Sequence, residues 1–439
     1  MRVMDRYANQ MTETLFSLLS VDSVQGSPAE GAPFGVGTKE ALDRFLALAA
    51  SFGLRTKDID GYCGYAEIGE GELLGIPFHL DTVPFGEDWT HSPLGEVTEG
   101  EMGKVIYGRG AEDDKGPAVG VLYALKSLLD EGKKPRRRIR LIAGLNEESG
   151  WKCIERYLAT EEIPSLSFSP DADFPVIYSE KGVCHLALTL PLGDGVYAFQ
   201  GGERVNMVAD RATLDVAGIS DAALFKCLQG GIKVKALERG LRLSATGVSA
   251  HGSTPEKGEN AILKILYAVK SSSEFLADLY DALHATDGSG LGIALSDEKS
   301  GALSLNVGKV ESDETTVTFS LDIRYPVSYT EDNILEKIRA AIPQATLSVL
   351  GRHAPLYVDP DSELVTNLLA AYNEVTGESA FPIAIGGATY ARAFPNAVAF
   401  GPVFPGEESR IHQKDESITV AAFIKCAEIY RAALEKLAF

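Results

Sequence analysis

The first part of the chain alternates between helical patterns and short apolar runs, and this alternation limits the fold more than any other feature. Apolar runs at 73–78, 139–143 and 166–169 predict buried strands. Between them, apolar residues recur at helical spacing over 118–129, and a further helix is predicted over 38–52. Strands that alternate with helices in this way are typical of an α/β domain with a mostly parallel sheet.

Ionisable side chains follow each of these three strands directly. His79 and Asp81 follow the first strand, Glu147 and Glu148 the second, and Asp171 the third. In open α/β sheets, ligands bind beyond the carboxyl ends of the strands. We therefore expect these side chains to meet at one edge of the sheet, although acids at such positions can also simply cap the following helix.

Two adjacent carboxylates, Asp113 and Asp114, lie in a glycine-rich loop at 108–117, just before a predicted helix. The loop is not a phosphate-binding loop, because Lys115 lacks a following Ser or Thr. Carboxylates are hard ligands, and one aspartate can bridge two metal ions. The loop is thus a candidate metal loop, with an exposed polar turn as the alternative.

The pattern changes after about residue 183, where alternating strands of antiparallel type dominate. It returns to the earlier type near residue 356. We predict an α+β domain over 184–354, inserted into a discontinuous α/β domain formed by 1–183 and 355–439.

Charge and cysteine usage narrow the class of protein. The formal net charge of −21 argues against nucleic acid or an anionic membrane as partner. The five cysteines are scattered and form no CxxC pair, which favours buried thiols in a reducing compartment. No apolar run approaches the length of a membrane span. We therefore expect a soluble, cytoplasmic protein.

Together, these motifs resemble the M20 co-catalytic metallopeptidases. The motifs, in family order, are His79-x-Asp81, Gly108-Arg109-Gly110-x-x-Asp113-Asp114-Lys115-Gly116, Glu147-Glu148-x-Gly150 and Ile411-His412. The segments Ser169–Pro175 and Glu180–Gly182 are similar to the PepV-type dipeptidase branch of that family. The resemblance covers essentially the whole chain.

The resemblance implies a centre of two divalent metal ions. Asp113 would bridge them, His79 and Asp171 would complete one ion, and Glu148 and His412 the other. This set of nitrogen and oxygen ligands suits Zn²⁺, with Mn²⁺ or Co²⁺ as alternatives because no thiolate is present.

Two further acids have expected roles beside the metal ligands. Consecutive side chains diverge, so Glu147 cannot easily bind the same ion as Glu148 and is left as the general base that takes a proton from water. Asp81 points to the same side as His79 in an extended segment and can hold the imidazole in its ligating tautomer. Asp114 is expected to shape the loop without binding metal.

The remaining candidate site residues are implied by the same resemblance. His251 would reach across to stabilise the oxyanion of the tetrahedral intermediate, and Arg324 would pair with a substrate carboxylate. Asn206, Gly387 and Arg392 would complete the substrate site. The alternatives are a loop histidine, a strand-surface ion pair at Arg324 and a plain glycine-rich turn at 386–387.

The expected function is therefore hydrolysis of unblocked dipeptides by a monomer whose long inserted domain closes as a lid over short substrates. The alternative is a deacylase or desuccinylase of N-acyl amino acids with the same chemistry, and a non-catalytic metal- or peptide-binding module is disfavoured. The sequence has neither a Gly-x-Ser-x-Gly elbow nor an HExxH motif, which argues against serine hydrolase and zincin chemistry.

Overall fold

In the computed structural model, which describes residues 2–100 and 103–439, the chain divides into two units. Unit 1 comprises Met1–Tyr178, Val358–Ile383 and Thr389–Phe439, and unit 2 comprises Ser179–Tyr357 and Ala384–Ala388. These boundaries differ by a few residues from those predicted at 183/184 and 354/355. The glycine-rich segment 384–388, expected with the outer parts of the chain, belongs to unit 2.

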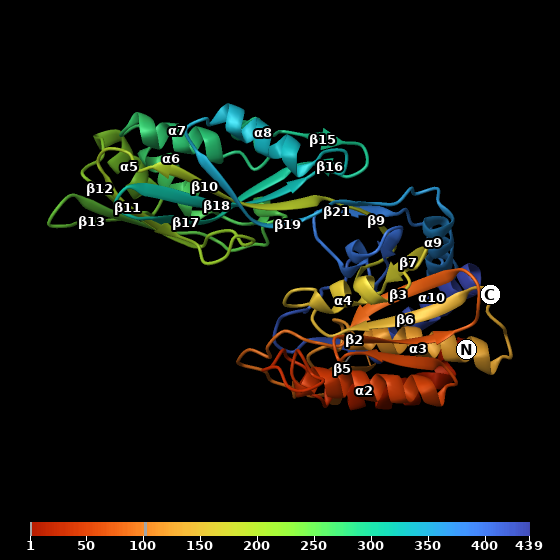
Figure 1. Cartoon of the computed structure of the whole chain (residues 1–439). Coiled ribbons are helices and arrows are strands. Elements are labelled where there is room, and N and C mark those ends of the chain that lie inside the picture. The colour runs from red at the N-terminus through yellow and green to blue at the C-terminus, as the bar shows by residue number, and fades with distance from the viewer. Residues whose placement is uncertain (1, 101–102) are drawn as a thin grey trace. The chain divides into compact units, whose positions relative to one another are not determined.

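Unit 1 is built on a mixed sheet whose central strands are parallel. The strands run in the order β1 (Arg55–Ile59), β2 (Cys63–Ile68), β6 (Arg138–Gly144), β3 (Leu73–His79), β7 (Leu166–Ser169), β22 (Ala397–Ala399) and β9 (Ile177–Glu180). β3 is parallel to β6 and β7, β7 is parallel to β22, and β1 and β2 add an antiparallel edge. Figure 1 shows β2, β3 and β6 side by side. The predicted mostly parallel sheet is confirmed.

The burial of β3 agrees with its apolar sequence up to His79. All of its residues are buried, as expected for a central parallel strand that is covered on both faces. The predicted helices at 38–52 and 118–129 are confirmed as α2 (Val36–Ser51) and α3 (Lys115–Asp130). α3 packs against α10 (Val420–Ala438), and its buried side chains lie on nearly every face.

The other elements of unit 1 complete its surface and its edges. They are η1 (Val3–Tyr7), α1 (Ala8–Leu19), β4 (Glu96–Gly100), β5 (Gly103–Tyr107), α4 (Lys152–Thr160), β8 (Ala172–Asp173), α9 (Glu363–Thr376), η4 (Tyr390–Ala393), β23 (Pro402–Val403) and β24 (Ser417–Thr419). β21 (Ile383–Ile385) pairs with β9 where the chain passes between the two units.

Unit 2 is an antiparallel α+β unit. Its sheet has the order β13 (Lys233–Ala236), β14 (Leu241–Thr246), β12 (Arg211–Val216), β11 (Val196–Gly201), β17 (Ser304–Ser312), β18 (Thr316–Tyr325), β10 (Gly182–Pro191) and β19 (Thr346–His353). Its helices lie along one side of the sheet in Figure 1: α5 (Asp221–Gln229), α6 (Ala261–Val269), α7 (Glu274–Leu283) and α8 (Glu331–Ala341). The remaining short elements are η2 (Pro255–Lys257), η3 (Ser289–Leu291), β15 (Ser296–Asp297), β16 (Gly301–Ala302) and β20 (Leu356–Tyr357). One hydrophobic core joins sheet and helices.

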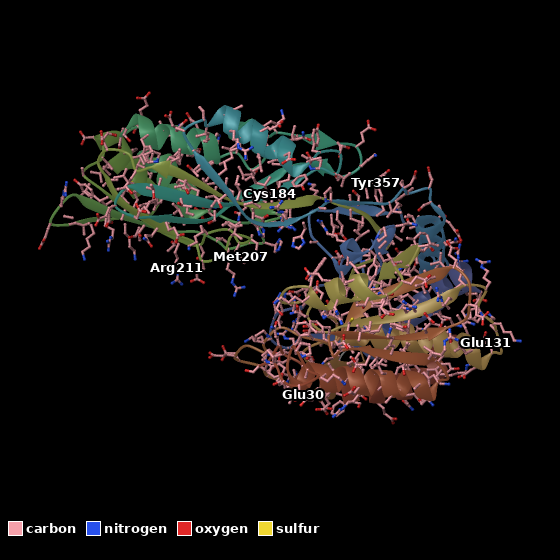
Figure 2. All side chains as sticks on the ribbon, in the orientation of Figure 1. Glu30, Glu131, Cys184, Met207, Arg211 and Tyr357 are labelled. Carbon is pink, nitrogen blue, oxygen red and sulfur yellow. The ribbon has the colours of Figure 1, made fainter. Side chains whose placement is uncertain are left out.

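The described residues contain neither a membrane-spanning helix nor a disulfide bond. Within residues 2–100 and 103–439, none of the helices combines the length and apolar character needed to span a bilayer. All five cysteines are free and buried, including Cys184, which Figure 2 labels.

Candidate metal centre

The expected convergence of strand ends occurs in unit 1. His79 is the last residue of β3, Glu148 follows β6 and Asp171 follows β7. Asp113 lies in the loop directly before α3. His412 comes from the segment before β24 and completes the group. Five side chains from five segments therefore meet beyond the carboxyl ends of the parallel strands.

Asp113 lies between the two imidazoles. Its Oδ1 is 2.9 Å from Nε2 of His79, and its Oδ2 is 3.0 Å from Nε2 of His412. Each imidazole also faces a second carboxylate: Oδ2 of Asp171 is 3.8 Å from Nε2 of His79, and Oε2 of Glu148 is 3.1 Å from Nε2 of His412. The cluster thus consists of two halves that share one carboxylate.

Among the residues that the structure describes, two groups of side chains have ligand atoms close enough to hold a metal ion. They are His79, Asp113 and Glu148, and His79, Asp114 and Asp171, with the ligand atoms of each group within 4.8 Å of one another. Asp114, which was expected only to shape the loop, therefore lies within ligand distance. Its Oδ2 accepts the backbone N–H of His79 at 3.2 Å, while its Oδ1 has no hydrogen-bond partner.

The charges in this cluster perturb one another strongly. Hydrogen bonds to Asp113 and Glu148 raise the pKa of His412 to about 10. Burial and, to a lesser extent, the nearby Asp113 together raise the pKa of Asp171 to about 7. Burial also raises the pKa of Asp113, but hydrogen bonds from His412 and His79 outweigh it and leave that pKa below its ordinary value. Protons on the imidazoles thus balance the packed carboxylates, and divalent cations can replace those protons.

The hydrogen bond that orients His79 differs from the expected one. Nδ1 of His79 lies 2.9 Å from the main-chain oxygen of Asp81 and 3.6 Å from its carboxylate. Because a carbonyl oxygen only accepts, Nδ1 carries a proton. Nε2 faces the cluster, where a divalent cation can replace the proton that it donates to Asp113. The Asp81 carboxylate instead accepts the backbone N–H groups of Glu147 and Glu148, at 3.1 and 3.2 Å. The prediction that this carboxylate holds the imidazole is corrected: it holds the loop that carries the next ligand.

Glu147 lies beside the cluster but belongs to neither group of potential metal ligands among the described residues. Its Oε1 accepts a hydrogen bond from Nε1 of Trp151 at 3.1 Å. Burial raises the pKa of Glu147 well above its ordinary value, and nearby carboxylates such as Asp171 add to the effect. A carboxyl group whose pKa is raised in this way is suited to accept and return a proton.

Sequence reasoning missed a buried acid that organises the Asp113 loop. Glu416, with no exposed surface, accepts hydrogen bonds from the backbone of this loop and from Arg109. Burial and, to a lesser extent, the neighbouring Asp113 raise the pKa of Glu416 to about 7, although hydrogen bonds from the loop and from Arg109 oppose the shift. The signal in the sequence was its position four residues after His412.

Unit 2 brings together three of the other predicted site residues. The backbone of Asn206 accepts the N–H of Gly252 at 2.7 Å, and the neighbours Met207 (labelled in Figure 2) and His251 form a β-bridge. Burial lowers the pKa of His251, and the positive charge of Arg324 lowers it further. A Cβ at Gly252 would lie 2.5 Å from the Asp322 carboxylate, so only glycine fits there.

Arg324 is already paired within unit 2. Its Nε and Nη2 donate to the two carboxylate oxygens of Asp322, at 2.7 and 2.9 Å, and its Nη1 donates to the Gly386 carbonyl at 3.2 Å. Asp322, which is fully buried, was missed in the sequence, although residues two apart on a strand share a face. Gly387 follows Gly386 in unit 2, whereas Arg392 belongs to unit 1, in η4.

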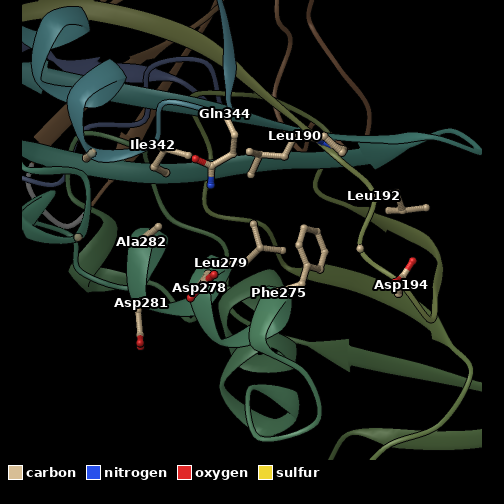
Figure 3. Close-up of a pocket in the computed structure, with 14 residues that line it drawn as sticks. Leu190, Leu192, Asp194, Phe275, Asp278, Leu279, Asp281, Ala282, Ile342 and Gln344 are labelled. Atoms are coloured by element: carbon tan, nitrogen blue, oxygen red, sulfur yellow. The ribbon is translucent and has the colours of Figure 1, made fainter.

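Unit 2 also contains a cavity of about 640 Å³ between α7 and the end of β10, shown in Figure 3. Leu190, Phe275 and Leu279 form its apolar part, and Asp194 and Asp278 are among its polar residues. None of the predicted site residues lines this cavity, so it is separate from the candidate site.

Comparisons with known proteins agree with the geometry of unit 1. A profile described as "Peptidase family M20/M25/M40" matches residues 75–436. The protein named "Putative dipeptidase YtjP" of Bacillus subtilis is 34% identical over 446 residues, covering 96% of this chain and 95% of that protein. A protein named "Putative dipeptidase" of Staphylococcus epidermidis is 35% identical over 463 residues, covering 98% of this chain and 97% of that protein.

A solved structure shares the fold. The crystal structure of human carnosine dipeptidase 1 aligns with a TM-score of 0.59 over 99% of this chain and 97% of that one, at 16% sequence identity. The resemblance inferred from the motifs is confirmed: this chain belongs to peptidase family M20/M25/M40.

Proposed function

We propose that this protein is a metal-dependent dipeptidase that hydrolyses the peptide bond of unblocked dipeptides. The observation that carries the proposal is the position of Asp113, whose two carboxylate oxygens each face a different imidazole. A carboxylate with this arrangement can bridge two cations. Relatives named as putative dipeptidases cover nearly the whole chain and support the substrate class.

The donor set fits two divalent cations. His79 and Asp171 would hold one and His412 and Glu148 the other, with Asp113 shared. Imidazole and carboxylate donors without a thiolate suit Zn²⁺ best, and Mn²⁺ or Co²⁺ are acceptable. When bound, such a pair lowers the pKa of a water molecule and polarises the scissile carbonyl.

The protein's own residues then handle the protons and the developing charge. Glu147 takes a proton from the attacking water and returns it to the leaving amine. His251 stabilises the oxyanion by donating a hydrogen bond. Nδ1 of His251 accepts the backbone N–H of Ser253 at 3.2 Å, so in the neutral ring Nε2 carries the proton. The lowered pKa of His251 keeps the ring neutral at pH 7.

Arg324 and Arg392 are proposed to bind the free carboxylate of the substrate. Arg324 is held rigidly by Asp322, which fixes the direction of its remaining N–H groups. Asn206 and Gly387 lie on the same unit and are proposed to contact the substrate backbone, and Arg392 is a second anion contact.

The five buried thiols support a cytoplasmic location. The monomeric state stays a prediction.

The first test is metal-dependent hydrolysis with matched substrates. Chelated protein is assayed on a dipeptide with free ends, on the same dipeptide carrying an N-acetyl group, and on an N-acetyl amino acid. Each is measured before and after addition of Zn²⁺ or Mn²⁺. We expect cleavage of the free dipeptide alone, and only after metal is added. Cleavage of the acylated compounds alone would instead identify a deacylase, and no cleavage with either metal would contradict a hydrolase function.

A second prediction follows from the corrected role of Asp81. In Asp81→Asn, one of the two acceptor oxygens becomes an NH₂ group that faces a backbone N–H of the 147–148 loop. The Asp81 carboxylate positions the loop that carries Glu148, and loss of such an outer partner of a metal ligand should lower kcat by about 10–100-fold. His79 should still bind metal, since its own hydrogen bond goes to the main chain. Asp60→Asn, an exposed site in the same unit, is the control, and an unchanged kcat in Asp81→Asn would contradict this role.

A further inference from the structure

We propose that Glu416 is a positioning residue that ties the Asp113 loop to the His412 segment and thereby sets the geometry of the metal centre. The inference rests on the proposed function, because it concerns the same metal centre. It assigns a role to a residue that is not itself expected to bind metal.

One carboxylate oxygen holds three backbone N–H groups of the loop. Oε1 of Glu416 accepts the N–H groups of Gly110, Glu112 and Asp113, at 3.0, 3.0 and 3.2 Å. The main-chain oxygen of Glu416 also accepts the N–H of Gly108, at 3.0 Å. Gly110 has a φ of +95°, which residues with a side chain rarely adopt, so the loop is neither helix nor strand at this position.

The other oxygen of Glu416 is fixed by a buried cation. Oε2 accepts a hydrogen bond from Nη1 of Arg109 at 2.7 Å, and Arg109 is only 2% exposed. Nη2 of Arg109 donates to the Phe85 carbonyl at 3.2 Å, and the guanidinium lies 5.2 Å from the Trp89 ring. Four donors thus converge on one side chain, which leaves it no freedom to move relative to the loop.

The side chain of His412 contacts Asp113 and Glu148 of the cluster, whereas the position of its backbone depends on this anchor. Its side chain is 51% exposed, and its φ of 60° places it in an irregular turn. The turn is fixed at its end by two buried acids. Asp415 accepts the N–H groups of Thr90 and His91, at 2.9 and 3.1 Å, and Glu416 accepts those of the Asp113 loop. Glu416 therefore fixes the distance between Asp113 and His412.

A second buried ion pair in unit 1 provides a matched control. Nη2 of Arg140 lies 2.6 Å from Oε2 of Glu67, and the two residues are 4% and 7% exposed. Arg140 also donates to Tyr157, and Glu67 accepts from Arg55. Neither residue belongs to the groups of potential metal ligands among the described parts of the chain. A purely structural effect of losing a buried Arg–Glu pair should therefore be the same at both places.

The experiment compares Glu416→Gln with Glu67→Gln in the full-length protein. Glutamine keeps the shape, but its NH₂ group faces either the guanidinium or the loop N–H groups, and the charge that balances the buried arginine is lost. The thermal unfolding temperature should fall in both variants. Only Glu416→Gln should lose Co²⁺ affinity, by about 10–100-fold in competition with a chelator, and only it should have an altered visible absorption spectrum of bound Co²⁺.

The outcomes separate the two proposals. Wild-type affinity and a wild-type Co²⁺ spectrum in Glu416→Gln, with a loss of stability similar to that of Glu67→Gln, would overturn the positioning role and leave the proposed function intact. Failure of the wild-type protein to bind Co²⁺ would overturn both. If Glu416→Gln does not fold, Arg109→Lys replaces it. This variant keeps the three backbone hydrogen bonds and a positive charge. We therefore expect the visible absorption of bound Co²⁺ to be weaker than in the wild type but not lost, and an unchanged spectrum would overturn the inference.

Discussion

Replacing Glu147 by glutamine should lower kcat for a free dipeptide by about 10²–10⁴-fold, the usual contribution of a general base. Two equivalents of metal should remain bound. Glutamine has nearly the same shape but cannot accept a proton from water at neutral pH. Glu147 lies outside both groups of potential metal ligands among the described residues, so its carboxylate stays available to accept a proton. Its Oε1 is held by Nε1 of Trp151, so the functional oxygen has a defined direction.

The measurement is kcat together with the metal content of the purified variant. Glu155→Gln, an exposed position on α4, is the control for a carboxylate lost nearby. A fall in KM alone, or normal turnover with two bound ions, would show that another group acts as the base. Loss of metal from Glu147→Gln would show instead that Glu147 is a ligand.

Replacing Asp113 by asparagine should weaken the binding of both metal ions and abolish activity at ordinary metal concentrations. An amide has one oxygen, so only one of the two halves of the cluster can still be ligated. Because a shared ligand is lost, each affinity should fall by more than the roughly 10–100-fold that the loss of an outer hydrogen-bond partner costs. His79→Ala removes a ligand from one half only and should weaken one ion.

Isothermal titration with Zn²⁺ distinguishes these two variants by stoichiometry and affinity. The contrast between them is the test, since both changes lie in the same buried cluster. If Asp113→Asn bound two equivalents of Zn²⁺ with wild-type affinity, the prediction that Asp113 is shared by the two ions would be wrong. If His79→Ala lost both ions together, the division of the cluster into two halves would be wrong.

The sequence predicted those features that depend on local periodicity. The strands at 73–78, 139–143 and 166–169 are observed as β3, β6 and β7, and the helices after Gly35 and Asp114 as α2 and α3. Because apolar runs of this kind are buried on both faces, they also predict a parallel sheet, and the strand ends then predict where polar side chains meet.

The sequence did not predict which atom of a residue makes the hydrogen bond to its partner. Asp81 was expected to use its carboxylate on His79, but an extended chain also places its main-chain oxygen within reach of Nδ1, at 2.9 Å. Once that bond forms, the carboxylate is free to accept the N–H groups of the 147–148 loop. Arg324 was assigned to substrate without its partner Asp322 for the same reason, since side-chain pairing is decided by packing.

The strand-and-helix pattern, and with it the order of the acids and histidines, can be read from the sequence because it depends on neighbours within a few turns of chain. How these residues are held depends on packing between segments that are far apart in the chain. The hydrogen bond from the backbone of Asp113 to Glu416 joins residues 303 positions apart. No local periodicity encodes such a contact, because burial of Glu416 beside Arg109 exists only after the sheet and its loops have come together.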